Sequence, residues 1–172
     1  MGLKTDLESA FNNTLENGGT SDELATAITA AYENACNSGS DIIGNSYKGQ
    51  SFSLVETSIK AAFAICINAK TIPLNLIPVS ASLVACWATA SLKLPATHPG
   101  FSVVQSGNVT VSIPPPTPPL IGESDNIDPI VNAFFNMFTL HAKSIQFLYS
   151  GLALAGSPPP PITIPATIFN IN

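Results

Sequence analysis

The helical character of this protein is clearest near its start, in the stretch TDLESAFNNTLENGGTSDELATAITAAYENACN (residues 5–37). Apolar residues recur every four positions from just before this stretch and form one stripe, which comprises Leu3, Leu7, Phe11 and Leu15. This pattern predicts a helix over 6–17 and, with the next apolar stripe, a second helix over 21–37. Gly18 and Gly19 end the first helix. The stretch therefore predicts an antiparallel hairpin of two amphipathic helices.

Three places in the sequence carry a hydroxyl residue followed three positions later by glutamate. These pairs are Thr5/Glu8, Thr20/Glu23 and Ser53/Glu56. In such a capping box, each side chain satisfies a backbone N–H group of the first helical turn. We therefore expect a helix to begin at each of the three places.

Three further helices are predicted over 54–70, 79–92 and 128–149. The first and the last are apolar on nearly every side, which indicates that they are buried on most sides. Pro73 and Pro78 are expected to break the chain before the helix that begins at 79.

Short strands are predicted near 102–105, 109–113 and 162–169, where β-branched residues alternate with polar ones. Two segments, NVTVSIPPPTPP (108–119) and SPPPPITIPATIF (157–169), each join such a run to a polyproline spacer. Consecutive prolines favour an extended chain. We therefore expect two extended Pro-rich arms.

These elements predict a mainly α fold of about five helices, with short strands and extended Pro-rich arms. The expected organisation is a helical body over 1–100 that begins with the hairpin at 6–37, then a strand and polyproline linker over 101–126. An apolar helix over 127–156 and an extended C-terminal arm over 157–172 complete it. The 172 residues are expected to form one compact unit.

The charge content is low. Asp, Glu, Lys and Arg make up 10% of the residues, against about 25% in an ordinary globular protein. All six cations are lysines, and the net charge is −5. Because nucleic-acid binding needs clustered cations, we expect no nucleic-acid partner. A surface with so few charges favours coverage by protein partners or by lipid.

The residues predict no catalytic, cofactor-binding or metal site. The two histidines, His98 and His141, have no Cys, Asp or Glu at the spacing of zinc ligands. The three cysteines are widely spaced and fit reduced, buried thiols: Cys36, Cys66 and Cys86. We therefore expect neither an enzyme nor a small-molecule partner.

A small integral membrane protein is the main alternative. The segment 71–92 has 22 residues without a charge, which is long enough to span a bilayer as a helix. Pro73 and Pro78 in its first half argue against that reading, as does the lack of flanking lysine clusters. A ligand-binding domain or an enzyme of unknown chemistry is the third alternative.

The favoured interpretation is a structural subunit of a large assembly, in which much of the subunit surface is interface. Extended arms can add a strand to a neighbour's sheet, so we expect the C-terminal arm to dock at least partly on another chain. The expected assembly interface comprises Val109, Val111, Ile113, Phe134, Phe135, Phe138, Ile162, Ile164, Ile168 and Phe169.

The N-terminal run LKTDLESAFNNTLENGGTSDELATAITAAYENA (3–35) resembles the start of small virion structural proteins of tailed bacteriophages, especially those with contractile tails. The Pro-rich segments NVTVSIPPPTPPL (108–120) and PPPPITIPATIF (158–169) are similar in character to extended segments of such proteins. The resemblance implies a role in a capsid, neck, tail or baseplate, with other copies and other virion proteins as partners. It implies synthesis in the host cytoplasm, a final location in the virion, and no catalytic residues.

Overall fold

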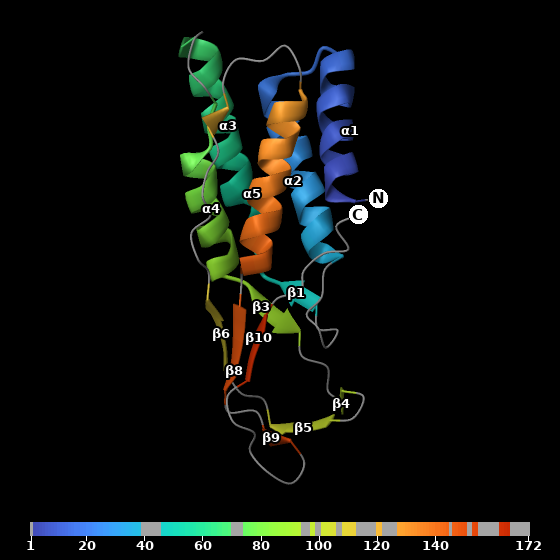
Figure 1. The fold of residues 1–172 in the computed structure, drawn as a ribbon, viewed down its shortest axis with the longest axis vertical. Coiled ribbons are helices and arrows are strands. Elements are labelled where there is room, and N and C mark those ends of the chain that lie inside the picture. The colour runs from blue at the N-terminus through green and yellow to red at the C-terminus, as the bar shows by residue number, and fades with distance from the viewer. Residues whose placement is uncertain are drawn as a thin grey trace.

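The computed structural model describes residues 2–38, 46–69, 74–93, 97–98, 101–105, 108–112, 120–121, 127–144, 146–150, 153–154 and 162–165. Within these residues the fold is mainly helical, as predicted. Its helices gather at one end and most of its short strands at the other (Figure 1).

The five helices run close to parallel or antiparallel to one another (Figure 1). They are α1 (Leu3–Glu16), α2 (Ser21–Asn37), α3 (Phe52–Ala69), α4 (Ile77–Ala88) and α5 (Asp128–Ser144). Helix α1 packs on α2, α2 on α3, and α3 on α4, while α5 packs on α1. The chain therefore forms two helical hairpins, α1–α2 and α3–α4, and α5 joins them.

The turn of the α1–α2 hairpin follows the predicted chemistry. Gly18 has a φ of 64°, in the left-handed region that favours glycine. The capping box at Thr20 and Glu23 is confirmed. The Glu23 N–H donates to Thr20 Oγ1 over 3.2 Å, and the Thr20 N–H donates to Glu23 Oε2 over 2.6 Å.

The other two predicted capping boxes are wrong. Helix α1 begins at Leu3 with Gly2 as its N-cap, and no side chain caps it. Helix α3 begins at Phe52. Thr5 and Ser53 therefore lie inside the first turn rather than before it, where a cap must stand.

Helix α4 differs from its prediction at both ends. It begins at Ile77, so Pro78 lies in its first turn instead of breaking the chain before it. Proline fits there because first-turn N–H groups have no acceptor within the helix. The Ile77 N–H instead donates to Asn75 Oδ1 over 3.0 Å. The helix ends at Ala88, so the segment 71–92 is not one continuous helix.

Helix α5 ends earlier than predicted. It stops at Ser144, and Gln146–Ser150 forms strand β8. The predictions of a helix over 128–149 and of an apolar helical unit over 127–156 are therefore wrong in their last part. The run Gln-Phe-Leu-Tyr is rich in residues that suit a strand paired on both sides.

The strands are short and every pairing is antiparallel. Besides β8 they are β1 (Ser46–Lys48), β2 (Leu74–Asn75), β3 (Ser91–Lys93), β4 (Thr97–His98), β5 (Phe101–Gln105), β6 (Asn108–Ser112), β7 (Leu120–Ile121), β9 (Ala153–Leu154) and β10 (Ile162–Pro165). Strand β8 lies between β6 and β10 in one sheet. Strands are thus not confined to the three expected stretches. The expectations that one face of each strand is buried and that the Pro-rich segments form extended arms remain predictions.

The core lies where α5 meets the two hairpins. The Phe134 ring centroid is 6.4 Å from that of Phe11 on α1 and 6.3 Å from that of Phe63 on α3. One residue of α5 therefore contacts both hairpins. The largest fully buried side chains around it are Trp87, Tyr32, Phe138, Leu7, Ile28, Ile59, Leu76, Leu83 and His141.

Candidate functional site

The predicted interface residues of α5 belong to the core of the chain. Phe134 and Phe138 have exposed fractions of 0%, so the prediction that they form an assembly interface is wrong. Phe135 is half-buried and packs against the same core. The apolar circumference of α5 reflects its place between two hairpins, which covers it from several sides.

The structure brings four other predicted interface residues together in the sheet around β8. Val109 of β6 and Ile162 of β10 both pair with Tyr149. Val111 of β6 and Ile164 of β10 both pair with Phe147 of β8. Residues 162–165 thus pair with their own chain, which differs from the expectation of docking on another chain. Three predicted interface residues lie outside the described residues: Ile113, Ile168 and Phe169.

A buried polar contact joins the two hairpins. The indole Nε1 of Trp87 on α4 donates to the Tyr32 hydroxyl on α2 over 2.7 Å. The Tyr32 ring stacks on Phe138 of α5 at a centroid distance of 4.3 Å and meets Phe52 edge-on at 5.9 Å. Burial raises the pKa of Tyr32 well above its usual value, so its hydroxyl stays neutral. The hydrogen bond joins α2 to α4, and the ring stacking joins α2 to α5.

Two cysteines lie in the same region and are buried, as predicted. Cys36 follows Tyr32 by one helical turn on α2, and both side chains are fully buried. Burial raises the pKa of Cys36 well above its usual value and raises the pKa of Cys86 to about 12. Both remain thiols near neutral pH, whereas a reactive cysteine needs the thiolate.

His141 is a buried member of α5. Its side chain is almost completely enclosed, and burial lowers its pKa to about 4. It is therefore a neutral imidazole near pH 7. The other histidine, His98, lies in strand β4. Among the described residues, no group of three or more His, Cys, Asp or Glu side chains could hold a metal ion.

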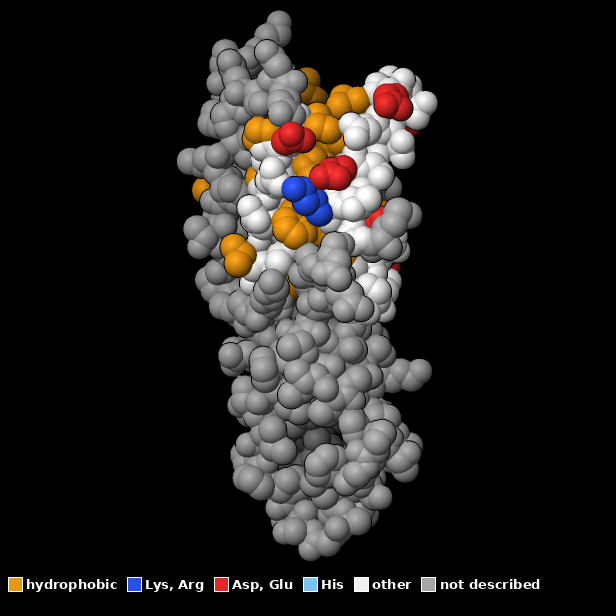
Figure 2. Space-filling view, turned by 45° about the vertical axis from the view of Figure 1, so that its right-hand side comes forward, with side chains coloured by type: hydrophobic (Ala, Val, Ile, Leu, Met, Phe, Trp, Pro, Cys, Tyr) orange, Lys and Arg blue, Asp and Glu red, His pale blue; other side chains and the backbone are white. Residues whose placement is uncertain are grey.

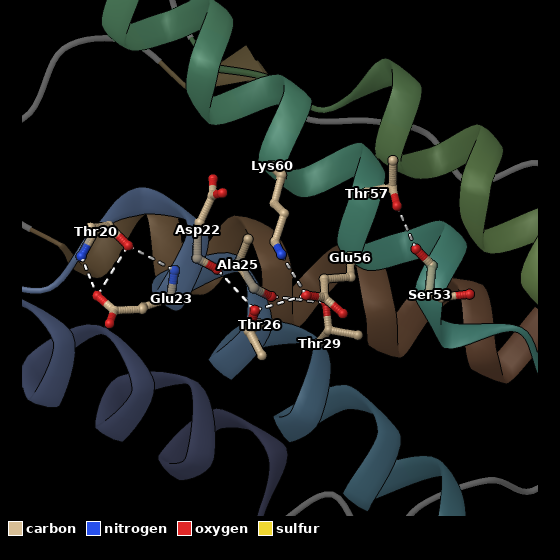
Figure 3. A network of polar contacts seen from close by, with 10 residues as sticks. All are labelled: Thr20, Asp22, Glu23, Ala25, Thr26, Thr29, Ser53, Glu56, Thr57 and Lys60. Atoms are coloured by element: carbon tan, nitrogen blue, oxygen red, sulfur yellow. Dashed lines mark hydrogen bonds and ion pairs between the residues drawn. The ribbon is translucent and has the colours of Figure 1, made fainter.

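A polar seam connects α2 to α3 at the surface (Figure 3). Thr26 Oγ1 donates to Glu56 Oε1 over 2.8 Å, and Lys60 Nζ lies 2.8 Å from the same oxygen. The hydrogen bonds from Lys60 and Thr26 lower the pKa of Glu56. Glu56 therefore binds Thr26 and Lys60 and does not form the capping box expected with Ser53.

Several apolar side chains of the α3–α4 hairpin are exposed. Ile65 and Ile67 on α3 have exposed fractions of 57% and 60%, and Ile77 on α4 is 54% exposed. The prediction that α3 is buried on most sides is therefore wrong at its C-terminal end. The α3–α4 face, as we define it, comprises the exposed residues Ala61, Ala64, Ile65, Ile67, Ile77, Pro78, Ala81, Ala85 and Ala88.

Sequence reasoning did not identify this face, although the sequence contains a signal for it. The stretch 71–92 carries no charge, a property that also fits a membrane span. In the part of the chain that the structure describes, none of the helices is long and apolar enough to cross a membrane. The same lack of charge leaves α4 with an uncharged outer surface.

Charged side chains gather elsewhere. Residues 3–37, which span the α1–α2 hairpin, include six acids and one lysine. Figure 2 shows acidic and basic side chains beside apolar patches on the face of the helical end that it presents. The α1–α2 hairpin is thus acidic, whereas the described residues of α3–α4 that follow Lys60 carry no charge, and this uncharged part is the candidate site for protein contacts.

No protein-family model, curated protein or solved structure matches this chain. The resemblance to bacteriophage virion proteins therefore stays a prediction.

Proposed function

We propose that this protein is a structural subunit of a large protein assembly, and specifically a bacteriophage virion component of the capsid, neck, tail or baseplate. It acts through contacts with other copies of itself and with other virion proteins. It is made in the host cytoplasm and ends in the virion. The observation that carries this proposal is the exposed α3–α4 face, because large apolar side chains gathered on a surface mark interaction sites.

The composition supports the same role. From Thr57 to the end of the chain there are seven charged residues, so this part of the sequence has few charges to place on a surface. Charged residues are depleted in the centres of protein interfaces, where they would lose their hydration. A subunit that is covered by neighbours has little use for the charges that keep a free monomer soluble.

The Pro-rich segments supply a second kind of contact in this proposal. The spacers at 114–119 and 158–161 favour an extended chain in advance of binding. Less conformational entropy is then lost when an arm docks. Residues 166–172, beyond the part that pairs with β8, are the segment that we propose to reach a neighbour.

Mass spectrometry of purified virus particles from the source tests the role directly. If the proposal holds, this chain is present in a fixed copy number relative to the major capsid or tail protein, and it stays with the particles through density-gradient purification. Its presence only in the soluble fraction of infected cells would contradict the proposal. The matched reference is a known non-virion protein of the same lysate, which sets the background level.

A further inference from the structure

We infer that Asn17, in the turn of the first hairpin, is a modification site, at which the side-chain amide is lost by spontaneous deamidation. Asn17 follows the last residue of α1, and both Asn17 and Gly18 are exposed to solvent. Water is the only co-reactant, and it reaches both residues. Deamidation depends on the chain alone and not on the proposed assembly role.

The residue after Asn17 makes this asparagine different from the others. In deamidation, the backbone nitrogen of the next residue attacks Cγ of the asparagine side chain. Asn17 is the only asparagine in the sequence that is followed by glycine. Gly18 has no Cβ, so it neither shields its own nitrogen nor restricts the rotations that bring this nitrogen to Cγ. The sequence therefore favours reaction at Asn17 over every other asparagine.

The reaction proceeds in two steps. In the first, a bond forms between the Gly18 nitrogen and Asn17 Cγ, the Cγ–Nδ2 bond breaks, and the Gly18 N–H proton leaves with the amide as ammonia. In the second, water opens the resulting five-membered imide. Addition of water at Cγ gives aspartate at position 17. Addition at the backbone carbonyl carbon gives isoaspartate, in which the backbone runs through Cβ and Cγ.

The folded turn slows the first step. Asn17 has a ψ of 4°, which places the Gly18 nitrogen beside the nitrogen of Asn17 itself and away from Cβ. Ring closure therefore requires rotation about ψ, which breaks two hydrogen bonds of the turn. The Gly18 N–H donates to the Leu15 carbonyl over 3.2 Å, and the Gly19 N–H donates to the Thr14 carbonyl over 2.7 Å. Because opening at a helix end costs little free energy, the turn slows deamidation without preventing it.

The products do not fit the turn as asparagine does. Asn17 Nδ2 donates to the Asn13 carbonyl over 2.7 Å, and a carboxylate has no proton to donate there. Its negative charge also lies at the C-terminal end of α1, where the helix dipole disfavours it. Isoaspartate lengthens the backbone just before Gly19, where a Cβ would already lie 2.7 Å from Thr14 Cγ2. Deamidation should therefore destabilise the first hairpin.

Incubation of the full chain in mildly alkaline buffer, with and without urea, tests the inference. Peptide mass spectrometry detects the mass increase of about one dalton, and fragmentation assigns it to a residue. Asn37 is the internal reference, because it is exposed and ends α2 but precedes Ser38, which carries a Cβ. Asn17 should convert about tenfold faster than Asn37 in urea. It should remain the faster of the two without urea, where its own rate is lower.

Two variants separate the chemistry from the fold. Asn17→Gln keeps an amide but requires a six-membered ring, so conversion at this position should be lost on the same time scale. Gly18→Ala places a Cβ beside the attacking nitrogen and should slow conversion of Asn17 about tenfold in urea. The comparison is made in urea because alanine is strained at the φ of 64° that Gly18 has in the folded turn.

The stability of the product is measured on the same samples. Ion exchange separates the deamidated protein, which carries one more negative charge, from the unmodified protein. The urea midpoint of the deamidated fraction should be lower than that of the unmodified fraction, because the Asn17 Nδ2 bond to Asn13 is lost.

Equal conversion of Asn17 and Asn37 would overturn the inference, as would conversion of Gly18→Ala at the wild-type rate in urea. Equal rates with and without urea would overturn the slowing by the turn, and equal midpoints would overturn the destabilisation. None of these results bears on the abundance of the chain in purified particles. Failure of this inference is therefore distinguishable from failure of the assembly role.

Discussion

The two helical hairpins of this protein bury similar inner faces and present different outer ones. In α1–α2 the inner side chains Leu7 and Ile28 are fully buried, and in α3–α4 so are Ile59 and Leu83. Outside, the first hairpin is acidic, while the second has exposed isoleucines and alanines. Packing of the core thus does not determine which residues lie on the outer surface of a hairpin. The exposed apolar side chains of α4 and of the C-terminal half of α3 are available for protein contacts without loss of fold.

The two hairpins are held together by a few large buried side chains. Phe134 of α5 contacts a ring from each hairpin, and the Tyr32–Trp87 hydrogen bond joins α2 directly to α4. Variants at these positions test whether the hairpins form one cooperative unit. Variants on the outer surfaces test how far the two hairpins differ.

The largest effect is expected for Phe134→Ala. The substitution removes the ring that packs against Phe11 and Phe63 and leaves a cavity, so the free energy of unfolding should fall by about 3–5 kcal/mol. Urea unfolding followed by circular dichroism measures the change. Leu140→Ala on the same helix is the control, because Leu140 is 67% exposed and its truncation should cost less than about 0.5 kcal/mol. Similar losses for the two variants would contradict the placement of Phe134 between the hairpins.

The next effect concerns pH and the helix between the hairpins. Burial lowers the pKa of His141 from 6.5 to about 4, so the folded state favours the neutral imidazole. As the pH falls through about 6.5, the unfolded chain binds a proton that the folded chain does not bind until about pH 4, and stability is lost across that window. The loss amounts to about 3.5 kcal/mol at most, since one pKa unit corresponds to about 1.4 kcal/mol and the pKa falls from 6.5 to about 4.

Urea unfolding at about pH 7 and about pH 5 measures this dependence, above the range in which most carboxyl groups titrate. His141→Gln is the comparison protein, because it cannot take up the proton but retains His98 and every acid. Its free energy of unfolding should change less between the two pH values than that of the wild type. Equal changes in both proteins would exclude His141 as the source.

A smaller loss is expected for Tyr32→Phe. This substitution keeps the ring that stacks on Phe138 but removes the hydroxyl that accepts from Trp87 Nε1. Loss of a hydrogen-bond acceptor in a buried site should lower the free energy of unfolding by about 1–3 kcal/mol. The Trp87 fluorescence spectrum gives an independent readout, since the indole N–H loses a partner. An unchanged stability together with an unchanged spectrum would show that this bond does not join the hairpins.

The sequence predicts the helices better than their surroundings, for physical reasons. Apolar spacing is a local property, so all five helices could be located. Their ends depend on competition with neighbouring elements. The Gln146–Ser150 segment is apolar enough to extend α5, but pairing with β6 and β10 makes it a strand. That pairing involves residues far apart in the chain, which periodicity cannot reveal.

The candidate site was harder to predict than the fold. An apolar residue looks the same in a sequence whether it fills a core or lies on a surface. Phe134 and Phe138 were expected at an interface and are buried, whereas Ile65 and Ile67 were expected in a buried helix and are exposed. Which side of a helix its neighbours cover is decided by tertiary packing. The lack of charge in 71–92 was visible in the sequence, but it fits a membrane span and an exposed contact face equally well.

The smallest effect distinguishes two threonines that look equivalent in the sequence. Thr20 accepts the Glu23 N–H at the start of α2, so Thr20→Ala should lower the free energy of unfolding by about 1 kcal/mol. Thr5 precedes Glu8 at the same spacing but lies within α1, which begins at Leu3 with Gly2 as its N-cap. Thr5→Ala should therefore change stability by less than about 0.5 kcal/mol. Chemical denaturation of both variants under one set of conditions decides the point. Equal losses would mean that α1 begins after Thr5 in solution, and the two helices of the first hairpin would then start in the same way.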